Sequence, residues 1–343
     1  MSIDRRRFEL RQASGISRRD MLSKCSTGFG MVALTSLLGR EGLLAAPASR
    51  LANPFAAKLP HFAAKAQRVI FLFMSGGPSH VDLLDPKPDL IRLAGQPIPE
   101  SFGTFKTRRA VAKNKLLAPL REFRPRGQSG TEISDFLPHI ASCADELCVL
   151  RGCHGDSVTH PESVYQMNTG SILMGRPSLG SWATYGLGTE NQNMPAFVVM
   201  PDPSGWVKGG APAWGNGYMP AAYQGTILRG GASPILNLAT PAGISGAQQA
   251  ATVDFINQLN RENLAAGEED SELAARIAAY ELAFRMQQHA PDVVDISRET
   301  EATKKLYGLD QKITEEFGLR CLLARRMLER GVRFVQLYCG DTN

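Results

Sequence analysis

Four short and almost uninterrupted apolar runs most constrain the fold of this 343-residue chain. They occupy residues 68–74, 147–151, 196–200 and 332–339. Strands that are apolar along their length, without alternating polar residues, are typical of a parallel sheet covered by helices on both faces. Helices are expected over residues 136–146, 161–168, 246–265, 270–289 and 313–330. Because strand and helix patterns alternate, the sequence predicts an α/β fold with a mostly parallel central sheet.

The first 48 residues have the composition of an export signal. Arg18 and Arg19 precede a weakly apolar run from Cys25 to Leu38, and small residues follow up to Ala48. This order resembles a bacterial twin-arginine signal, and the alternative is an amphipathic helix with a chance arginine pair. The apolar run is shorter than the roughly 20 residues that span a bilayer. We therefore expect recognition by the twin-arginine export machinery, a periplasmic or cell-envelope location and no integral membrane span in the mature chain.

The remainder divides into a Pro-, Ala- and Lys-rich tether over residues 49–67 and one large domain over residues 68–343. The formal net charge of +5 is concentrated at the N-terminus, where residues 1–46 carry eight basic and four acidic side chains. The rest of the chain has a balance of only +1. A body so close to neutral lacks the charge pattern of a nucleic-acid-binding protein, so no nucleic-acid partner is expected.

The cysteines predict neither a disulfide framework nor a Cys-x-x-Cys metal site. Five of the six follow the predicted signal, at positions 143, 148, 153, 321 and 339. We interpret them mainly as buried thiols, with Cys148 and Cys339 in core strands.

Polar residues follow the predicted strands, where the ligands of open α/β sheets gather. Asp82 and Asp85 come after the first strand, and His154 and His160 come after the second. A third such place is residues 340–343, after the last strand. Carboxylate and imidazole ligands suit Zn, Mn or another divalent ion. The alternatives are that the aspartates cap turns and that the histidines are ordinary hydrogen-bonded loop residues.

Thr159 starts the next predicted helix, three residues before Glu162, which is the spacing of a capping box. It is therefore a candidate helix N-cap on the residues alone.

Several longer strings resemble the domain-of-unknown-function 1501 family of exported bacterial proteins. They are Phe73–Asp82 continuing into Asp85–Pro88, Thr159–Pro161 with Met167–Gly170, Gly175–Trp182, and Gly331–Gln336. The resemblance covers essentially all of residues 68–343, and it places the chain in the alkaline-phosphatase and sulfatase superfamily.

The resemblance implies a divalent-metal site (Zn, Mn, Mg or Ca) at the carboxyl edge of the sheet. Asp82 or Asp85 matches the position of the superfamily's first metal ligand, and Thr159 matches that of its catalytic nucleophile. Metals and a helix N-terminus would neutralise an anionic ester and activate the attacking hydroxyl. The maturation string of formylglycine sulfatases, Cys or Ser followed by x-Pro-x-Arg, is absent after Cys153. An ordinary sulfatase of that kind is therefore not expected.

Relatives continue beyond the last predicted strand, so we expect this chain to be truncated at its C-terminus. An incomplete fold with too few metal ligands would be inactive. For the intact protein, the leading hypothesis is metal-dependent hydrolysis of phosphate or sulfate esters in a small molecule or glycan. The alternative is a non-catalytic envelope protein that keeps the fold for binding or for structure.

Overall fold

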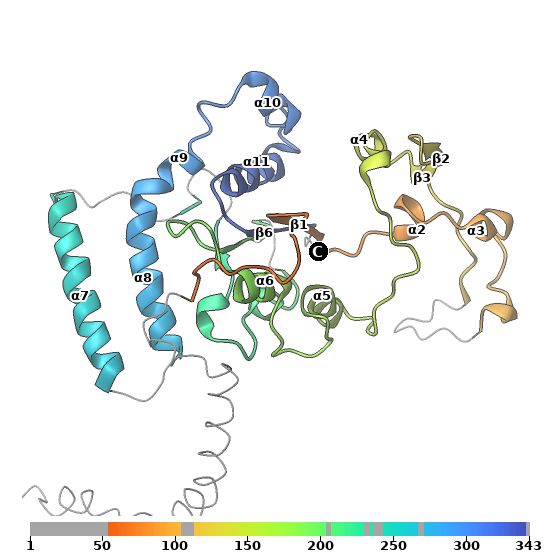
Figure 1. Cartoon of the computed structure of the whole chain (residues 1–343). Helices are drawn as coiled ribbons and strands as arrows, with labels where there is room; N and C mark the ends of the chain where they lie inside the picture. Colours follow the sequence, from red (N-terminus) through yellow and green to blue (C-terminus); the bar gives the residue numbers. More distant parts are fainter. Residues whose placement is uncertain are drawn as a thin grey trace, which may run out of the picture. The chain divides into compact units, whose positions relative to one another are not determined.

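A computed structural model describes residues 54–103, 113–203, 207–229, 234–235, 243–266 and 271–340. The predicted signal peptide lies outside these residues. The central sheet has four strands in the order β1 (Val69–Met74), β6 (Phe334–Cys339), β4 (Phe197–Met200) and β5 (Thr226–Ile227), and all neighbours pair in parallel (Figure 1). The predicted strands at residues 68–74, 196–200 and 332–339 are therefore confirmed, as is the α/β class with a parallel sheet.

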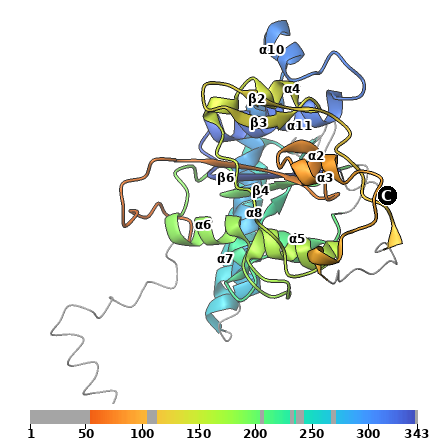
Figure 2. The same cartoon turned by 90° about the vertical axis from the view of Figure 1, so that its right-hand side faces the viewer.

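Helices cover both faces of the sheet. Helix α11 (Glu315–Glu329) lies over one face, and α5 (His160–Thr169) and α6 (Leu179–Leu187) lie over the other (Figures 1 and 2). Alternate residues of β6 serve the two cores: Val335 packs with α11, whereas Phe334 packs with α5. The apolar runs identified in the sequence thus reflect burial on both faces at the middle of the sheet.

Strand β1 differs from this expectation because it is an edge strand. Phe71 and Phe73 pack against the core on the α5 side. On the opposite face Ile70, Leu72 and Met74 are 39%, 55% and 54% exposed. Val335 and Leu337, the register partners of Ile70 and Leu72 on β6, pack in the core with α11, and this cover does not extend over β1.

A buried polar cluster links α5 to β6. The Gln336 amide and the Tyr338 hydroxyl both donate to Oδ1 of Asn168, whose own amide donates to the Val164 carbonyl at 2.7 Å. The three side chains that meet are at most 3% exposed. Every polar group buried here therefore has a partner, as buried polar groups require.

Helices at the C-terminal half add a further layer. Helices α7 (Gly246–Ala266) and α8 (Ser271–His289) pack against each other (Figure 1). The short helices α9 (Pro291–Val294) and α10 (Glu301–Leu306) then lead to α11. The helices predicted at residues 161–168, 246–265, 270–289 and 313–330 are confirmed with small shifts of their ends.

A two-stranded antiparallel hairpin forms from β2 (Phe123–Arg126) and β3 (Thr131–Ser134). It is accompanied by the short helices α2 (His80–Leu83), α3 (Pro88–Arg92) and α4 (Pro138–Ala141). Isolated 3₁₀ turns complete the structure at Glu100–Phe102, Ala144–Glu146, Ala211–Trp214 and Ala221–Tyr223. The single helix predicted over residues 136–146 is wrong, because the chain there forms α4 and a separate 3₁₀ turn.

The strand predicted at residues 147–151 is also wrong. The segment is irregular, and Leu147 and Leu150 are 40% and 75% exposed. Cys148 is exposed too, as are the cysteines at 143 and 153, so the expected buried thiols are confined to the half-buried Cys321 and Cys339. Four apolar residues are too few to distinguish a strand from an extended surface segment by pattern alone.

Candidate functional site

The loop after β1 carries Asp82 and Asp85, and each carboxylate is engaged by the protein. Oδ1 of Asp82 accepts the Leu120 amide hydrogen at 3.0 Å. Hydrogen bonds from the Ser79 side chain and the Leu120 backbone hold the pKa of Asp82 below its ordinary value. Asp82 therefore fastens its helical turn to the segment around Leu120.

Asp85 is buried and pairs with Lys87, whose Nζ lies 2.9 Å from Oδ1 and 2.8 Å from Oδ2. Hydrogen bonding from Lys87 lowers the pKa of Asp85. Nε2 of His80 lies 3.9 Å from the same carboxylate. Asp85 is thus an ionised carboxylate whose nearest charged partner is the ammonium group of Lys87.

The loop preceding α5 brings Thr159 to the predicted position. Thr159 is the N-cap residue of α5, with extended φ and ψ angles, but its side chain does not cap the helix. Its Oγ1 lies 3.0 Å from Oγ of Ser157, which in turn donates to Oε2 of Glu162. The capping box suggested by the spacing is therefore not formed, and the serine stands between threonine and glutamate.

These contacts order three oxygen atoms in a row. Because the Ser157 hydroxyl has one hydrogen and gives it to Glu162, its contact with Thr159 requires the threonine to donate. The backbone amide of Thr159 also donates to Oγ of Ser157, at 3.1 Å. A proton leaving the Thr159 hydroxyl would thus have a path through Ser157 to the carboxylate of Glu162.

His154 and His160, the other predicted ligands, are both exposed. Within the part of the chain that the structure describes, no three His, Cys, Asp or Glu side chains are grouped so that they could hold a metal ion. As placed, Asp82, Asp85, His154 and His160 do not make up a metal centre.

A cluster that the sequence did not reveal lies at the carboxyl ends of β4 and β6. Arg320 of α11 is 1% exposed, and its Nη1 donates to the Tyr338 carbonyl at 2.7 Å and to the Pro201 carbonyl at 3.3 Å. Its charge is balanced by Glu316, at 2.9 Å, and by Asp202, at 3.8 Å. The only signals available in the sequence are the helical spacing of Glu316 and Arg320 and the position of Asp202 directly after a strand.

The backbones that leave β1 and β6 approach each other closely at this edge. The Ser75 amide donates to the Cys339 carbonyl at 2.9 Å, and a Cβ atom on Gly76 would overlap the Gly340 carbonyl oxygen. The Gly340 amide donates to Oδ2 of Asp202 at 3.1 Å. Residues 341–343, which complete the third predicted polar loop, lie outside the described residues. The contacts of Arg320 and Asp202 hold the ends of β4 and β6 together, and the Ser75 amide joins the end of β1 to β6.

The fold and this edge define an α/β protein with a parallel sheet whose polar residues follow the strands. The family model described as "Protein of unknown function (DUF1501)" matches residues 66–341, so the chain belongs to this family. No curated protein and no solved structure matches the chain significantly. Among the described residues, no helix is long and apolar enough to cross a membrane.

Proposed function

We propose that this chain is a non-catalytic cell-envelope protein that binds its target on the surface of an alkaline-phosphatase-like α/β domain. The observation that carries the proposal is the engagement of Asp82 and Asp85 by Leu120 and Lys87. Hydrolysis by the superfamily's chemistry needs a metal to balance the ester's charge and activate the nucleophile. The described residues offer no grouped donor set for such a metal.

A second candidate is the hydrolysis of phosphate or sulfate esters that the family resemblance implies. It is favoured by the hydrogen bonds from Thr159 to Ser157 and from Ser157 to Glu162, at the first turn of the ten-residue helix α5. In this candidate Thr159 attacks the phosphorus or sulfur while its proton passes through Ser157 to Glu162, and the bond to the ester's alcohol breaks, so that the alcohol leaves with a proton from water. Water then hydrolyses the ester on Thr159 and releases phosphate or sulfate, and the helix N-terminus favours the anionic substrate.

One experiment separates the two candidates. The full chain is incubated with Zn, Mn, Mg or Ca, its bound metal is measured by mass spectrometry, and p-nitrophenyl phosphate and sulfate are assayed. The binding function predicts no stoichiometric metal and no turnover above that of Thr159→Ala. Turnover with stoichiometric metal that disappears in Thr159→Ala, and falls in Ser157→Ala, would refute it in favour of hydrolysis.

We propose further that the protein reaches the cell envelope by the twin-arginine route. The support is the Arg18-Arg19 pair before a mild apolar run. Fusion of residues 1–48 to a reporter that is active only after export should give signal. Replacement of both arginines by lysine should abolish it, and export that is unchanged in this variant would refute the route.

A further inference from the structure

Three aromatic side chains form an exposed row on one side of the domain. Trp182 and Tyr185 project from α6, and Tyr218 comes from the segment after Trp214. The ring centroid of Trp182 lies 6.3 Å from that of Tyr185 and 6.3 Å from that of Tyr218. Trp182, Tyr185 and Tyr218 are 46%, 45% and 67% exposed, so a continuous aromatic surface faces solvent.

The row is held in place by buried hydrogen bonds. The Ser178 amide and the Ser181 hydroxyl both donate to the Gly215 carbonyl at 3.0 Å, which ties the start of α6 to the segment carrying Tyr218. Gly217 has a φ of 56°, and a Cβ atom there would overlap the backbone of Arg176. A surface fixed in this way loses little conformational entropy when a ligand binds.

The buried ring of Tyr223 also supports the row. Tyr223 is 6% exposed, and its ring centroid lies 5.3 Å from that of Tyr185 in an edge-to-face arrangement. Phe55 packs on Tyr223 at 5.8 Å. The exposed rings are therefore the outer layer of an aromatic stack whose inner layer is core.

The polar ends of the row are available for hydrogen bonding. Within the described residues, neither the Trp182 indole N–H nor the hydroxyls of Tyr185 and Tyr218 hydrogen-bond to the protein. Each exposed side chain thus offers both an apolar face and an unengaged polar group. Such a surface suits a ligand that itself combines apolar faces with hydroxyl groups.

The segments that build the row carry charge of a single sign. The three segments that build it, residues 54–67, 171–189 and 207–229, contain five Lys or Arg and no Asp or Glu. Nζ of Lys58 lies 5.1 Å from the centroid of the Tyr185 ring and donates to the Tyr185 carbonyl at 2.6 Å. At the other end Arg176 is exposed, and its backbone packs on Gly217 beside Tyr218. The row is flanked by cations, which favours an anionic ligand.

We propose that this aromatic row, made of Trp182, Tyr185 and Tyr218, binds a sulfated polysaccharide. The C–H groups on a pyranose face carry partial positive charge and stack on the negative face of an aromatic ring. The sugar hydroxyls meet the free indole and phenol groups, and the sulfates lie near Lys58 and Arg176. This proposal rests on the binding function proposed above and specifies the target.

A single-stranded nucleic acid is the competing ligand, because it also stacks bases on aromatic rings. Such proteins track the phosphates with a strongly positive groove. Here the chain beyond residue 46 has a balance of only +1, with Lys58 at one end of the row and Arg176 near the other. A nucleic acid carries a phosphate at every unit, whereas a polysaccharide can carry sulfates on only some of its units, so a row with few cations favours the polysaccharide.

Binding of fluorescent dextran sulfate to the full chain tests the proposal. Dextran of the same length and an oligodeoxythymidylate serve as competing probes. Trp182→Ala and Tyr218→Ala should each weaken dextran sulfate binding by about tenfold, the size expected for one lost stacking contact. Trp182→Phe, which keeps an aromatic face, should retain most of the binding. Lys58→Ala should weaken the binding and reduce its salt dependence.

Matched controls are Phe102→Ala, which removes a ring that is 45% exposed outside the row, and Lys312→Ala, which removes an exposed cation outside it. Both should bind as the unmodified chain does. Since Tyr218 is the most exposed of the three rings, Tyr218→Ala tests the row even if Trp182→Ala reduces stability.

The proposal would be overturned by unchanged binding in Tyr218→Ala, by equal affinity for uncharged dextran, or by tighter binding of the oligodeoxythymidylate. Ester turnover would refute the proposed function whatever binds to the row. Absence of any polysaccharide binding, in a protein that also shows no turnover, would overturn only this inference.

Discussion

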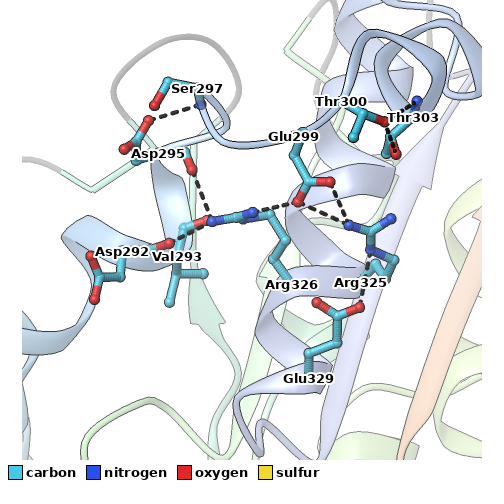
Figure 3. Close-up of polar contacts among 10 residues, drawn as sticks. All are labelled: Asp292, Val293, Asp295, Ser297, Glu299, Thr300, Thr303, Arg325, Arg326 and Glu329. Carbon is cyan, nitrogen blue, oxygen red and sulfur yellow. Dashed lines mark hydrogen bonds and ion pairs between the residues drawn. The ribbon is translucent and has the colours of Figure 1, made fainter.

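Replacing the buried Arg326 by alanine should be among the most destabilising changes in α11. Its guanidinium is directed at the C-terminal end of α9, where Nε donates to the Val293 carbonyl at 2.8 Å (Figure 3). Nη2 donates to the carbonyls of Asp292 and Asp295 at 2.6 and 2.8 Å, and Nη1 pairs with Glu299. One side chain thus satisfies three backbone acceptors and one carboxylate.

The expected magnitude follows from burial. Arg326 is only 7% exposed, so its removal leaves acceptors that water cannot readily reach. Breaking a buried charge pair of this kind costs about 3–5 kcal/mol. Arg325, the next residue, binds both oxygens of Glu299 at 2.9 Å, but its side chain is 33% exposed. A partly solvated pair contributes about 1 kcal/mol or less.

Urea denaturation of the full chain, Arg326→Ala and Arg325→Ala measures the difference. The denaturation midpoint should fall much further for Arg326→Ala, while the m-value should stay unchanged if only stability is affected. Equal losses in the two variants would refute the reasoning, because they would show that burial does not decide the contribution of these arginines.

Three further changes test other parts of the fold. The two arginines lower the pKa of Glu299 below its ordinary value of 4.5, so the stabilisation by Glu299 is present above pH 4.5 and is lost as the pH falls through the lowered pKa. The stability advantage of the unmodified chain over Glu299→Gln should therefore shrink when urea midpoints are compared from pH 6 to pH 3, and a constant difference would contradict this. Gly76→Ala should cost about 1–3 kcal/mol, because the new methyl overlaps the carbonyl of Gly340, and an unchanged thermal midpoint would show that the edge can relax. Asn168→Ala should cost about 1–3 kcal/mol for each buried donor left without an acceptor, and hence more than Tyr338→Phe in the same measurement.

The sheet could be predicted from the sequence where burial was two-sided. β4 and β6 are buried along almost their whole length, and their apolar runs predicted them within a residue or two. β5 has only two residues, which is too short to leave a pattern. The run ending at Leu150 had the right composition, but no strand among the described residues pairs with it. Composition reports what a strand buries, and it does not report whether a partner strand exists.

The candidate site was predictable only in part, because residue type does not fix what a side chain contacts. The position of Thr159 at the start of α5 followed from helix signals, and the structure agrees. Its link to Ser157 depends on how the preceding loop turns, which no local spacing encodes. The exposed aromatic row was missed for the same reason: Tyr218 is 36 residues from Trp182 in the chain, and only the tertiary fold brings them together.

The contacts of Asp82 and Asp85 distinguish the two candidate functions. A carboxylate that binds a metal needs its oxygens free to face the ion, and a carboxylate that fixes a turn needs them directed at amides or ammonium groups. Asp82 and Asp85 are of the second kind here. To become metal ligands, they would have to give up Leu120 and Lys87, and the loop would lose the contacts that position it. A metal centre at this edge would therefore require rearrangement of the loop, whereas the aromatic row is already assembled. This difference in preorganisation is the physical reason for placing binding ahead of hydrolysis.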